Sequence, residues 1–285
     1  MVLAAAVVAC AAASCSGPGS GPGACSPASP AGTISDTPGS QATWMLTRSA
    51  LAQMLSDPWF RVRPERTRSC ELLQPGQKPL SGVDATPVVT YPSVPELRSA
   101  LADNSLPAGT GAVLYDPEAW SYTPAAEQRN PVQAATQAAA LAHAHGLKII
   151  VAPALNLTTV LDPASSAQRW QTFLALRLAG PMARIADTIE LQAQSLERDP
   201  KAYASFVQAA AAQARADNRN VTVLAGLSTN PPGAVVSSQQ LTDAIVASRP
   251  DVDGYWLNIP GQGPRCPTCN PPRPDLGVAV LSSVL

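Results

Sequence analysis

The protein has 285 residues, of which 46% are hydrophobic and 14% are charged, and its formal net charge at pH 7 is −1. An intrinsically disordered chain is poorer in apolar residues and further from neutrality, so this composition predicts a folded globular protein. Binding to nucleic acid needs a basic surface that neutralises phosphates, and the sequence has no long basic run, so we exclude a nucleic-acid partner. The chain after residue 40 is long enough for one barrel domain.

The amino-terminal residues predict export. Residues 1–13 are small and apolar, which is typical of the hydrophobic region of a signal peptide and too short to cross a bilayer. Within them, the motif VVAC resembles the lipobox of bacterial lipoproteins, and this resemblance implies that Cys10 is lipidated. We therefore assign residues 1–15 to a signal peptide with a lipobox. The alternative is a plain signal peptide that is cleaved to release a secreted protein.

Proline and glycine are concentrated in two segments. Residues 16–40 contain 11 of them, and residues 260–277 contain 9. A segment rich in Gly, Pro and Ser buries too little apolar surface to offset its chain entropy. We interpret residues 16–40 as a flexible tether between a lipid anchor on the outer face of the cytoplasmic membrane and a domain at residues 41–285.

The six cysteines suit an exported protein, because disulfides form and persist outside the cytosol. Cys266 and Cys269 form the motif CPTC, which is compatible with a redox pair, half of a metal site or a local disulfide. A redox pair belongs at a strand-to-helix junction and a zinc site needs further ligands, whereas this motif lies among prolines and is not repeated. We predict a disulfide that closes this loop, leave Cys25 and Cys70 paired or free, and expect no metal site.

After the tether, short β-rich runs alternate with longer Ala-rich runs of helical period, the pattern of parallel α/β architecture. The predicted strands are residues 42–47, 87–91, 112–115, 147–152, 188–193, 221–227 and 254–259. The predicted helices are residues 94–102, 131–145, 167–178, 201–217 and 237–248. Pro131 and the Asp199 cap before Pro200 are helix-start signals, and Gly146 ends a helix.

The strand count predicts a (β/α)8-type TIM barrel whose first quarter is irregular or incomplete. Either residues 68–73 or residues 278–285 would supply the eighth strand. A doubly wound open sheet is the alternative. Its dinucleotide-binding form is disfavoured because no Gly-x-Gly-x-x-Gly motif follows a strand, and we expect no cofactor.

In such a barrel, functional side chains lie at the carboxyl ends of the strands, on the face that alternation directs into the lumen. Three segments place polar or aromatic residues there. The candidates are Glu190, Gln192 and Gln194 in the first segment, Ser228 and Asn230 in the second, and Trp256 and Asn258 in the third.

The most informative motif is LYDPEAW, in which Asp116 and Glu118 follow an apolar strand. Two close carboxylates disfavour joint ionisation, so one can hold its proton and act as a general acid. In the competing structural interpretation, Asp116 caps a turn, Glu118 pairs with an arginine and Trp120 packs on the barrel rim.

Aromatic residues near this motif suit a sugar ring. Trp120, Tyr122 and Trp256 offer flat apolar surfaces, and Tyr115 is a further substrate-binding candidate. Glycoside hydrolysis needs an acid, a second carboxylate or substrate group and often such a platform. His143 and His145 are the only histidines and lie on different helix faces, and no Gly-x-Ser-x-Gly elbow exists, so a Ser-His-Asp triad is not supported.

Longer stretches resemble known proteins. LYDPEAWSYTPAAEQRNP, IELQAQS, VLAGLSTNPPG and GYWLNIPGQGPRCPTC resemble a group of exported, uncharacterised TIM-barrel proteins of high-GC bacteria, over most of residues 42–285. Asp116-x-Glu118 is distantly similar to the end of the Asp-x-x-Asp-x-Asp-x-Glu motif of chitinase-type glycoside hydrolases. That similarity implies that Glu118 is the acid and that Asp116 orients an acetamido group, while Gly111 and Leu114 replace the motif's other aspartates.

The sequence therefore predicts an exported, lipid-tethered, glycoside-hydrolase-like barrel that acts on or binds carbohydrate. Glu118 would be the general acid and Asp116 and Glu190 the assisting or nucleophilic carboxylates, with Gln192, Trp256 and Asn258 orienting the sugar. The alternative is a non-catalytic carbohydrate-binding or structural surface lipoprotein, which the two missing aspartates favour.

Overall fold

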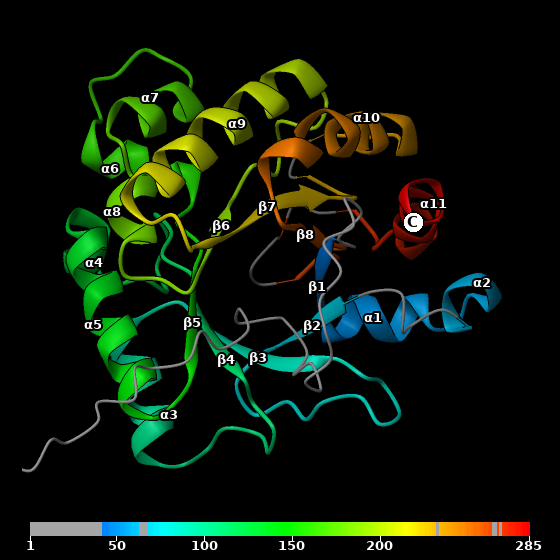
Figure 1. The fold of residues 1–285 in the computed structure, drawn as a ribbon, viewed down its shortest axis with the longest axis horizontal. Coiled ribbons are helices and arrows are strands. Elements are labelled where there is room, and N and C mark those ends of the chain that lie inside the picture. Colours follow the sequence, from blue (N-terminus) through cyan, green and yellow to red (C-terminus); the bar gives the residue numbers. More distant parts are fainter. Residues whose placement is uncertain (1–41, 63–67, 232–233, 264–266, 268–269) are drawn as a thin grey trace, which may run out of the picture.

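Eight parallel strands close into a barrel in the order β1 to β8, and helices surround it (Figure 1). This computed structural model describes residues 42–62, 68–231, 234–263, 267 and 270–285. The strands are β1 (Thr43–Thr47), β2 (Arg68–Leu73), β3 (Thr86–Tyr91), β4 (Ala112–Tyr115), β5 (Lys148–Val151), β6 (Thr188–Leu191), β7 (Thr222–Ser228) and β8 (Gly254–Asn258). The predicted TIM barrel is confirmed, and the closed strand order excludes the doubly wound sheet.

Three of the sequence predictions fall outside the described residues. They are the signal peptide with Cys10, the tether, and the disulfide between Cys266 and Cys269. The lipid anchor, export and this disulfide therefore stay predictions. Within the described ranges, no helix is both long and apolar enough to span a membrane.

The eighth strand is β2, whereas residues 278–285 fall largely in a helix. The barrel closes where β8 pairs with β1, with Thr43 opposite Gly254. A Cβ atom on residue 254 would lie 2.0 Å from the carbonyl oxygen of Thr43, so the close approach of these strands requires glycine.

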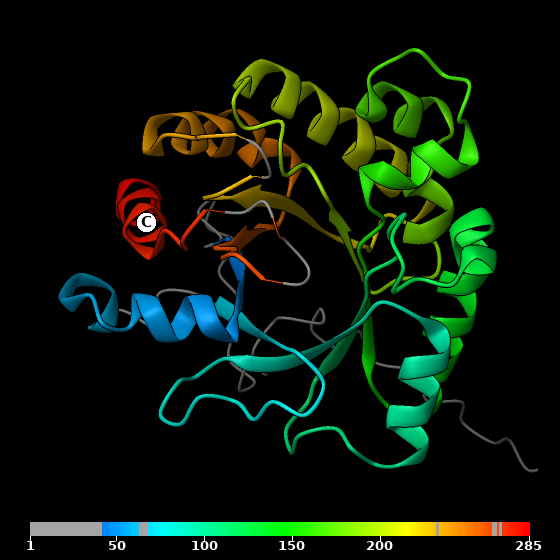
Figure 2. The ribbon, with the colours of Figure 1, turned by 180° about the vertical axis from the view of Figure 1, so that it is seen from behind.

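The helices follow the strands with one exception, since residues 74–85 between β2 and β3 form no helix. They are α1 (Arg48–Met54), α2 (Pro58–Arg61), α3 (Val94–Ala102), α4 (Ala125–Arg129), α5 (Pro131–Ala144), α6 (Thr158–Leu161), α7 (Arg169–Ala175), α8 (Ala179–Ala183), α9 (Pro200–Asp217), α10 (Ser238–Ser248) and α11 (Pro274–Val284), with 3-10 turns η2 (Leu155–Leu157) and η3 (Arg249–Asp251). The predicted helix at 167–178 corresponds to α7, which ends at Ala175 because Arg177 adopts a positive φ of 52°, and α8 begins beyond the predicted range. Helix α11 packs between α1 and α10, as both views show (Figures 1 and 2).

Strand alternation divides the core into two layers. In β4, Val113 and Tyr115 face the helices, whereas Ala112 and Leu114 face the barrel interior. The apolar interior consists of Met45, Cys70, Leu72, Val88, Ala112, Leu114, Ile150, Ala152, Leu224 and Trp256. The outer layer packs against Ala-rich helix faces, whose small side chains let the helices approach the sheet closely.

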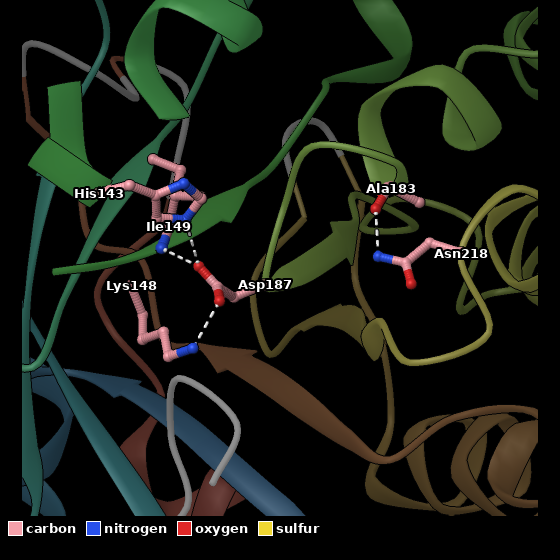
Figure 3. A network of polar contacts seen from close by, with 6 residues as sticks. All are labelled: His143, Lys148, Ile149, Ala183, Asp187 and Asn218. Atoms are coloured by element: carbon pink, nitrogen blue, oxygen red, sulfur yellow. Dashed lines mark hydrogen bonds and ion pairs between the residues drawn. The ribbon is translucent and has the colours of Figure 1, made fainter. Parts of the chain in front are cut away.

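The amino-terminal end of the barrel is stabilised by Asp187, which precedes β6 (Figure 3). Its carboxylate accepts hydrogen bonds from Lys148 Nζ at 2.8 Å, His143 Nε2 at 2.9 Å and the backbone N–H of Ile149 at 2.9 Å. Burial alone would raise the pKa of Asp187, but these hydrogen bonds outweigh it and lower the pKa below its ordinary value. Asp187 thus joins α5, β5 and β6 away from the carboxyl ends of the strands. In the same view, Asn218 after α9 donates to the carbonyl oxygen of Ala183 in α8 at 2.8 Å.

Asp187→Asn is expected to lower the free energy of unfolding by about 1–2 kcal/mol at pH 7, because a charge-assisted acceptor is lost. The depressed pKa means that the contribution of Asp187 is present above pH 3.8, its ordinary value, and is lost as the pH falls through the folded-state value. Urea unfolding at several pH values measures this. Asp243→Asn, at an exposed position of α10, is the control. An equal effect of the two substitutions would contradict this role.

Candidate active site

A cavity of about 640 Å³ lies at the carboxyl ends of the strands, where barrel enzymes carry their sites. This volume lies within the usual range of small-molecule pockets. The sequence-predicted residues that line it are Glu118, Trp120, Gln192, Gln194, Ser228, Trp256 and Asn258. Residues from the ends of β4, β6, β7 and β8 therefore meet around one cavity, which we call the barrel pocket.

Glu118 is half-buried and faces the barrel pocket. Its Oε2 accepts a hydrogen bond from Asn156 Nδ2 at 3.1 Å. The Oδ1 atom of the same amide accepts from the backbone N–H of Ala119 at 2.9 Å. One side chain from η2 therefore holds both the carboxylate and the backbone beside it.

The loop that carries Glu118 is fixed by Thr123, which is buried. Thr123 Oγ1 accepts from the backbone N–H of Glu118 at 3.2 Å and from Trp120 Nε1 at 2.9 Å, and it donates to the carbonyl oxygen of Pro92. Gln128 Nε2 donates to the carbonyl oxygens of Trp120 and Thr123. The carboxylate and the indole ring are thus held in place before any ligand arrives.

Asp116 lies deeper than Glu118 and is 7% exposed. Gln192 Nε2 donates to Asp116 Oδ1 at 2.6 Å and to the carbonyl oxygen of Ala152 at 2.9 Å. This amide links the ends of β4, β5 and β6. It also orients the Asp116 carboxylate beside Glu118.

Glu190 lies inside the barrel, with its side chain fully buried. Neither of its carboxyl oxygens has a hydrogen-bond partner among the described residues. Burial, together with the negative charges of Asp116 and Glu118, raises the pKa of Glu190 well above its ordinary value. Glu190 therefore favours its neutral, protonated form, and it lies close enough to both carboxylates to respond to their charge.

Aromatic rings from three parts of the chain border the barrel pocket. Trp120 stands edge-on to Tyr122, with 5.1 Å between the ring centroids. Trp256, only 8% exposed, connects the barrel interior to the pocket. Trp170 lines the pocket from α7. Together with the carboxyl and amide groups, these rings make a site suited to proton transfer on a flat, hydroxyl-rich ligand.

Gln194 lies against β7 because residue 226 is glycine. A Cβ atom on Gly226 would lie 2.5 Å from the terminal atoms of the Gln194 side chain. The glycine therefore makes room for the amide that forms part of the pocket wall.

Gly226→Ala is expected to displace Gln194 and to lower the free energy of unfolding by about 1 kcal/mol. In a Gln194→Ala background the clash is absent, and the same substitution should stabilise the protein by about 0.5 kcal/mol, because alanine loses less backbone entropy in a strand. A double-mutant cycle by chemical denaturation measures the coupling. Additive effects of the two substitutions would contradict the predicted contact.

Two predicted residues lie elsewhere. Tyr115 is on the helix-facing side of β4, where its hydroxyl donates to Glu127 Oε2 at 2.8 Å. Asn230 Nδ2 donates to the carbonyl oxygens of Asn270 at 2.7 Å and Pro260 at 3.2 Å. Asn230 thus connects the segments that follow β7 and β8, which places it behind the pocket wall.

The structure adds residues that the sequence did not indicate. Asn156, Arg169 and Trp170 line the pocket from the segment between β5 and α8. Glu197, in the loop between β6 and α9, is fully buried next to the pocket wall.

In the part of the chain that the structure describes, no three His, Cys, Asp or Glu side chains are placed to hold a metal ion.

No protein-family model and no curated protein matches this chain. Among solved structures, it is similar to a glycoside hydrolase family 17 beta-1,3-glucanosyltransferase from Rhizomucor miehei, with 14% identity, 80% of this chain and 90% of that chain covered, and a TM-score of 0.42. It is also similar to triosephosphate isomerase from Bartonella henselae, with 12% identity, 76% and 92% covered, and a TM-score of 0.39. A shared fold does not determine function, so function is argued from the site itself.

Proposed function

We propose that the barrel pocket binds carbohydrate and cleaves a glycosidic bond with Glu118 as the general acid. The observation that carries this proposal is a cluster of three carboxyl groups, Asp116, Glu118 and Glu190, below a pocket bordered by tryptophan rings. Glycoside hydrolysis needs a carboxylic acid at the leaving oxygen, a second group that stabilises the positive charge of the sugar ring, and contacts that orient the ring.

Asp116 and the residues that line the pocket have separate roles in this mechanism. Glu118 faces the pocket and gives its proton to the leaving oxygen as the bond between that oxygen and the anomeric carbon breaks. A water molecule then forms the new bond to the anomeric carbon and returns a proton to Glu118. Asp116, held by Gln192, supplies negative charge near the developing oxocarbenium ion or orients a substrate group that assists. Trp256 offers its ring to one face of the sugar, and Gln192 and Asn258 hydrogen-bond its hydroxyls.

A second function, carbohydrate binding without turnover, is favoured by two specific observations. Of the three carboxyl groups, Glu190 is fully buried and cannot touch a sugar in this conformation. Leu114, at a position where the chitinase-type motif has an aspartate, belongs to the apolar barrel interior. A pocket with one accessible carboxylate can hold a sugar through its rings and amides without cleaving it.

The amino-terminal sequence supports a proposal about where the protein acts. We propose that the chain is exported and lipidated at Cys10, and that residues 16–40 separate the barrel from the outer face of the membrane. Such a tether would present the pocket to carbohydrate at the cell surface.

A glycan screen tests the two functions. Oligosaccharides of several linkages are added to the protein, binding is followed by tryptophan fluorescence, and cleavage is followed by mass spectrometry of the products. Binding with new reducing ends supports hydrolysis, and binding without products supports the second function. A protein that binds no glycan would refute both.

A further inference from the structure

Glu197 is a buried carboxylate that the proposed mechanism does not use. Its side chain is fully buried in the loop between β6 and α9. Its Oε2 accepts the backbone N–H of Ser195 at 2.6 Å, and its Oε1 accepts the backbone N–H of Ser228 at 2.7 Å. Each carboxyl oxygen therefore holds a different strand-end segment.

Both segments form the wall of the barrel pocket, since Ser195, Leu196 and Ser228 line it. Ser195 has a φ of +88°, a conformation that is unfavourable for a non-glycine residue unless its surroundings hold it. The hydrogen bond from its N–H to Glu197 is one such restraint. The carboxylate thus fixes the backbone that brings Gln194 and Ser195 to the pocket.

The effect extends beyond the second segment. Ser228 Oγ accepts the backbone N–H of Asn230 at 3.1 Å, and Asn230 Nδ2 in turn donates to the segment after β8 at the carbonyl oxygen of Asn270. Asn230 Nδ2 also donates to the carbonyl oxygen of Pro260, which lines the pocket, so hydrogen bonds connect Glu197 through the end of β7 to a third part of the pocket wall.

The surroundings of Glu197 contain few charges. Tyr203 on α9 faces it closely enough for the Glu197 charge to raise the tyrosine pKa, and Glu190 on β6 lies near the same tyrosine. β7 carries no titratable side chain, and the neighbouring Arg198 and Asp199 are exposed.

Burial raises the pKa of Glu197 to about 7, against the opposing effect of the hydrogen bonds from its own N–H, Ser228 and Ser195. Its protonation therefore changes near neutral pH. Because the pKa of Glu197 is raised in the folded state, the stability of the fold decreases with rising pH. The contribution of Glu197 to folding is fully present below pH 4.5 and is lost as the pH rises to about 7.

We propose that Glu197 is a positioning residue whose ionised carboxylate holds the pocket wall together and whose protonation loosens it. Ionisation strengthens both N–H···O bonds, because a charged acceptor binds backbone amides more strongly than a neutral one. In the folded protein both hydrogen bonds should therefore be stronger and the wall more ordered at pH 8 than at pH 6, although the raised pKa means that ionisation lowers the stability of the fold as a whole. The consequence for ligand affinity rests on the proposed function; the structural change does not.

The structural part is tested by NMR on the full chain. The side-chain carboxyl carbon of Glu197 and the amide protons of Ser195 and Ser228 are followed from pH 5.5 to 8.5. All three resonances should titrate together near pH 7, and Glu197→Gln should abolish the change at both amides. Amide protons that do not move with the Glu197 carboxyl would overturn the proposal, and the wild-type titration alone decides this if the variant does not fold.

Glu71→Gln is the matched control. Glu71 is also a buried carboxyl group; it accepts the backbone N–H of Leu80 at 3.0 Å, and burial raises its pKa. It does not border the pocket. Its substitution should leave the titration of Ser195 and Ser228 unchanged.

The ligand part uses chitotetraose and laminaritetraose as probes. About one tenth of Glu197 is ionised at pH 6 and about nine tenths at pH 8. If the ionised form binds, affinity should fall by up to about tenfold from pH 8 to pH 6 in the wild type and in Glu71→Gln, and Glu197→Gln should remove most of that change. A wild-type dependence that Glu197→Gln retains in full would overturn the positioning role. If neither probe nor any glycan of the screen binds, the proposed function fails while the NMR titration still decides the role of Glu197.

Discussion

Glu118→Gln is expected to lower the turnover of a cleaved oligosaccharide by about 10²–10⁴-fold, the usual contribution of general acid catalysis. Glutamine has nearly the same shape and its carbonyl oxygen can still accept from Asn156, so the dissociation constant should change by less than about threefold. Because only proton donation is lost, the decrease in turnover should appear in kcat. Steady-state kinetics and a separate binding measurement check both numbers.

Glu96→Gln is the control for this experiment, since Glu96 lies on α3 and does not line the barrel pocket. It should leave both kcat and affinity unchanged. Equal turnover by the wild type and Glu118→Gln would remove Glu118 from the mechanism. Unchanged binding with no turnover in either protein would favour the binding function.

Glu190→Met is expected to raise the free energy of unfolding by about 1–4 kcal/mol at pH 7. The buried carboxyl group has no hydrogen-bond partner among the described residues, and replacing an uncompensated buried polar group with an apolar one of similar volume removes its desolvation cost. The raised pKa sets the pH dependence: the contribution of Glu190 to folding is fully present below pH 4.5 and decreases as the pH rises. The advantage of methionine should therefore grow above pH 4.5, as denaturant unfolding at pH 4 and pH 7 would measure.

The same variant should lose at least about tenfold in turnover if Glu190 supports Asp116 and Glu118. Residues that lower the stability of a protein but raise its activity are common at functional sites. Glu190→Gln keeps the polar group without the acid, so it separates the two effects and should give little of the stability gain. Destabilisation by Glu190→Met would contradict the assignment of an unpartnered neutral acid.

The barrel could be predicted because its signals are local. The alternation of short apolar runs with Ala-rich helices gave the architecture, and Pro131, Gly146 and Asp199 marked helix ends that the structure places within a residue or two. Side-chain alternation in β6 also put Glu190 and Gln192 on one face, and both lie on the interior side of the barrel.

The same rule, applied to β4, would have excluded Tyr115 from the pocket. Asp116 and Leu114 lie on the inward face, so the residue between them faces the helices. The error came from treating the LYDPEAW motif as one unit rather than from any tertiary effect.

Other parts of the site could not be predicted. Asn156 lies in an irregular segment after β5, and Trp170 lies in a predicted helix whose pattern does not show that one of its residues reaches the pocket. Glu197 lies in a charged, polar stretch that is typical of an exposed loop, and its burial follows only from how that loop packs on β7. Tertiary contacts of this kind leave no local pattern in the sequence.

The central claim is tested most directly by a crystal structure of the Glu118→Gln variant with chitotetraose or the best-bound glycan of the screen. The account predicts the sugar in the barrel pocket, one ring against Trp256 or Trp120, and a glycosidic oxygen within about 3 Å of the residue 118 side chain. A glycan bound elsewhere on the protein, or seated in the pocket with every glycosidic oxygen beyond the reach of residue 118, would contradict it.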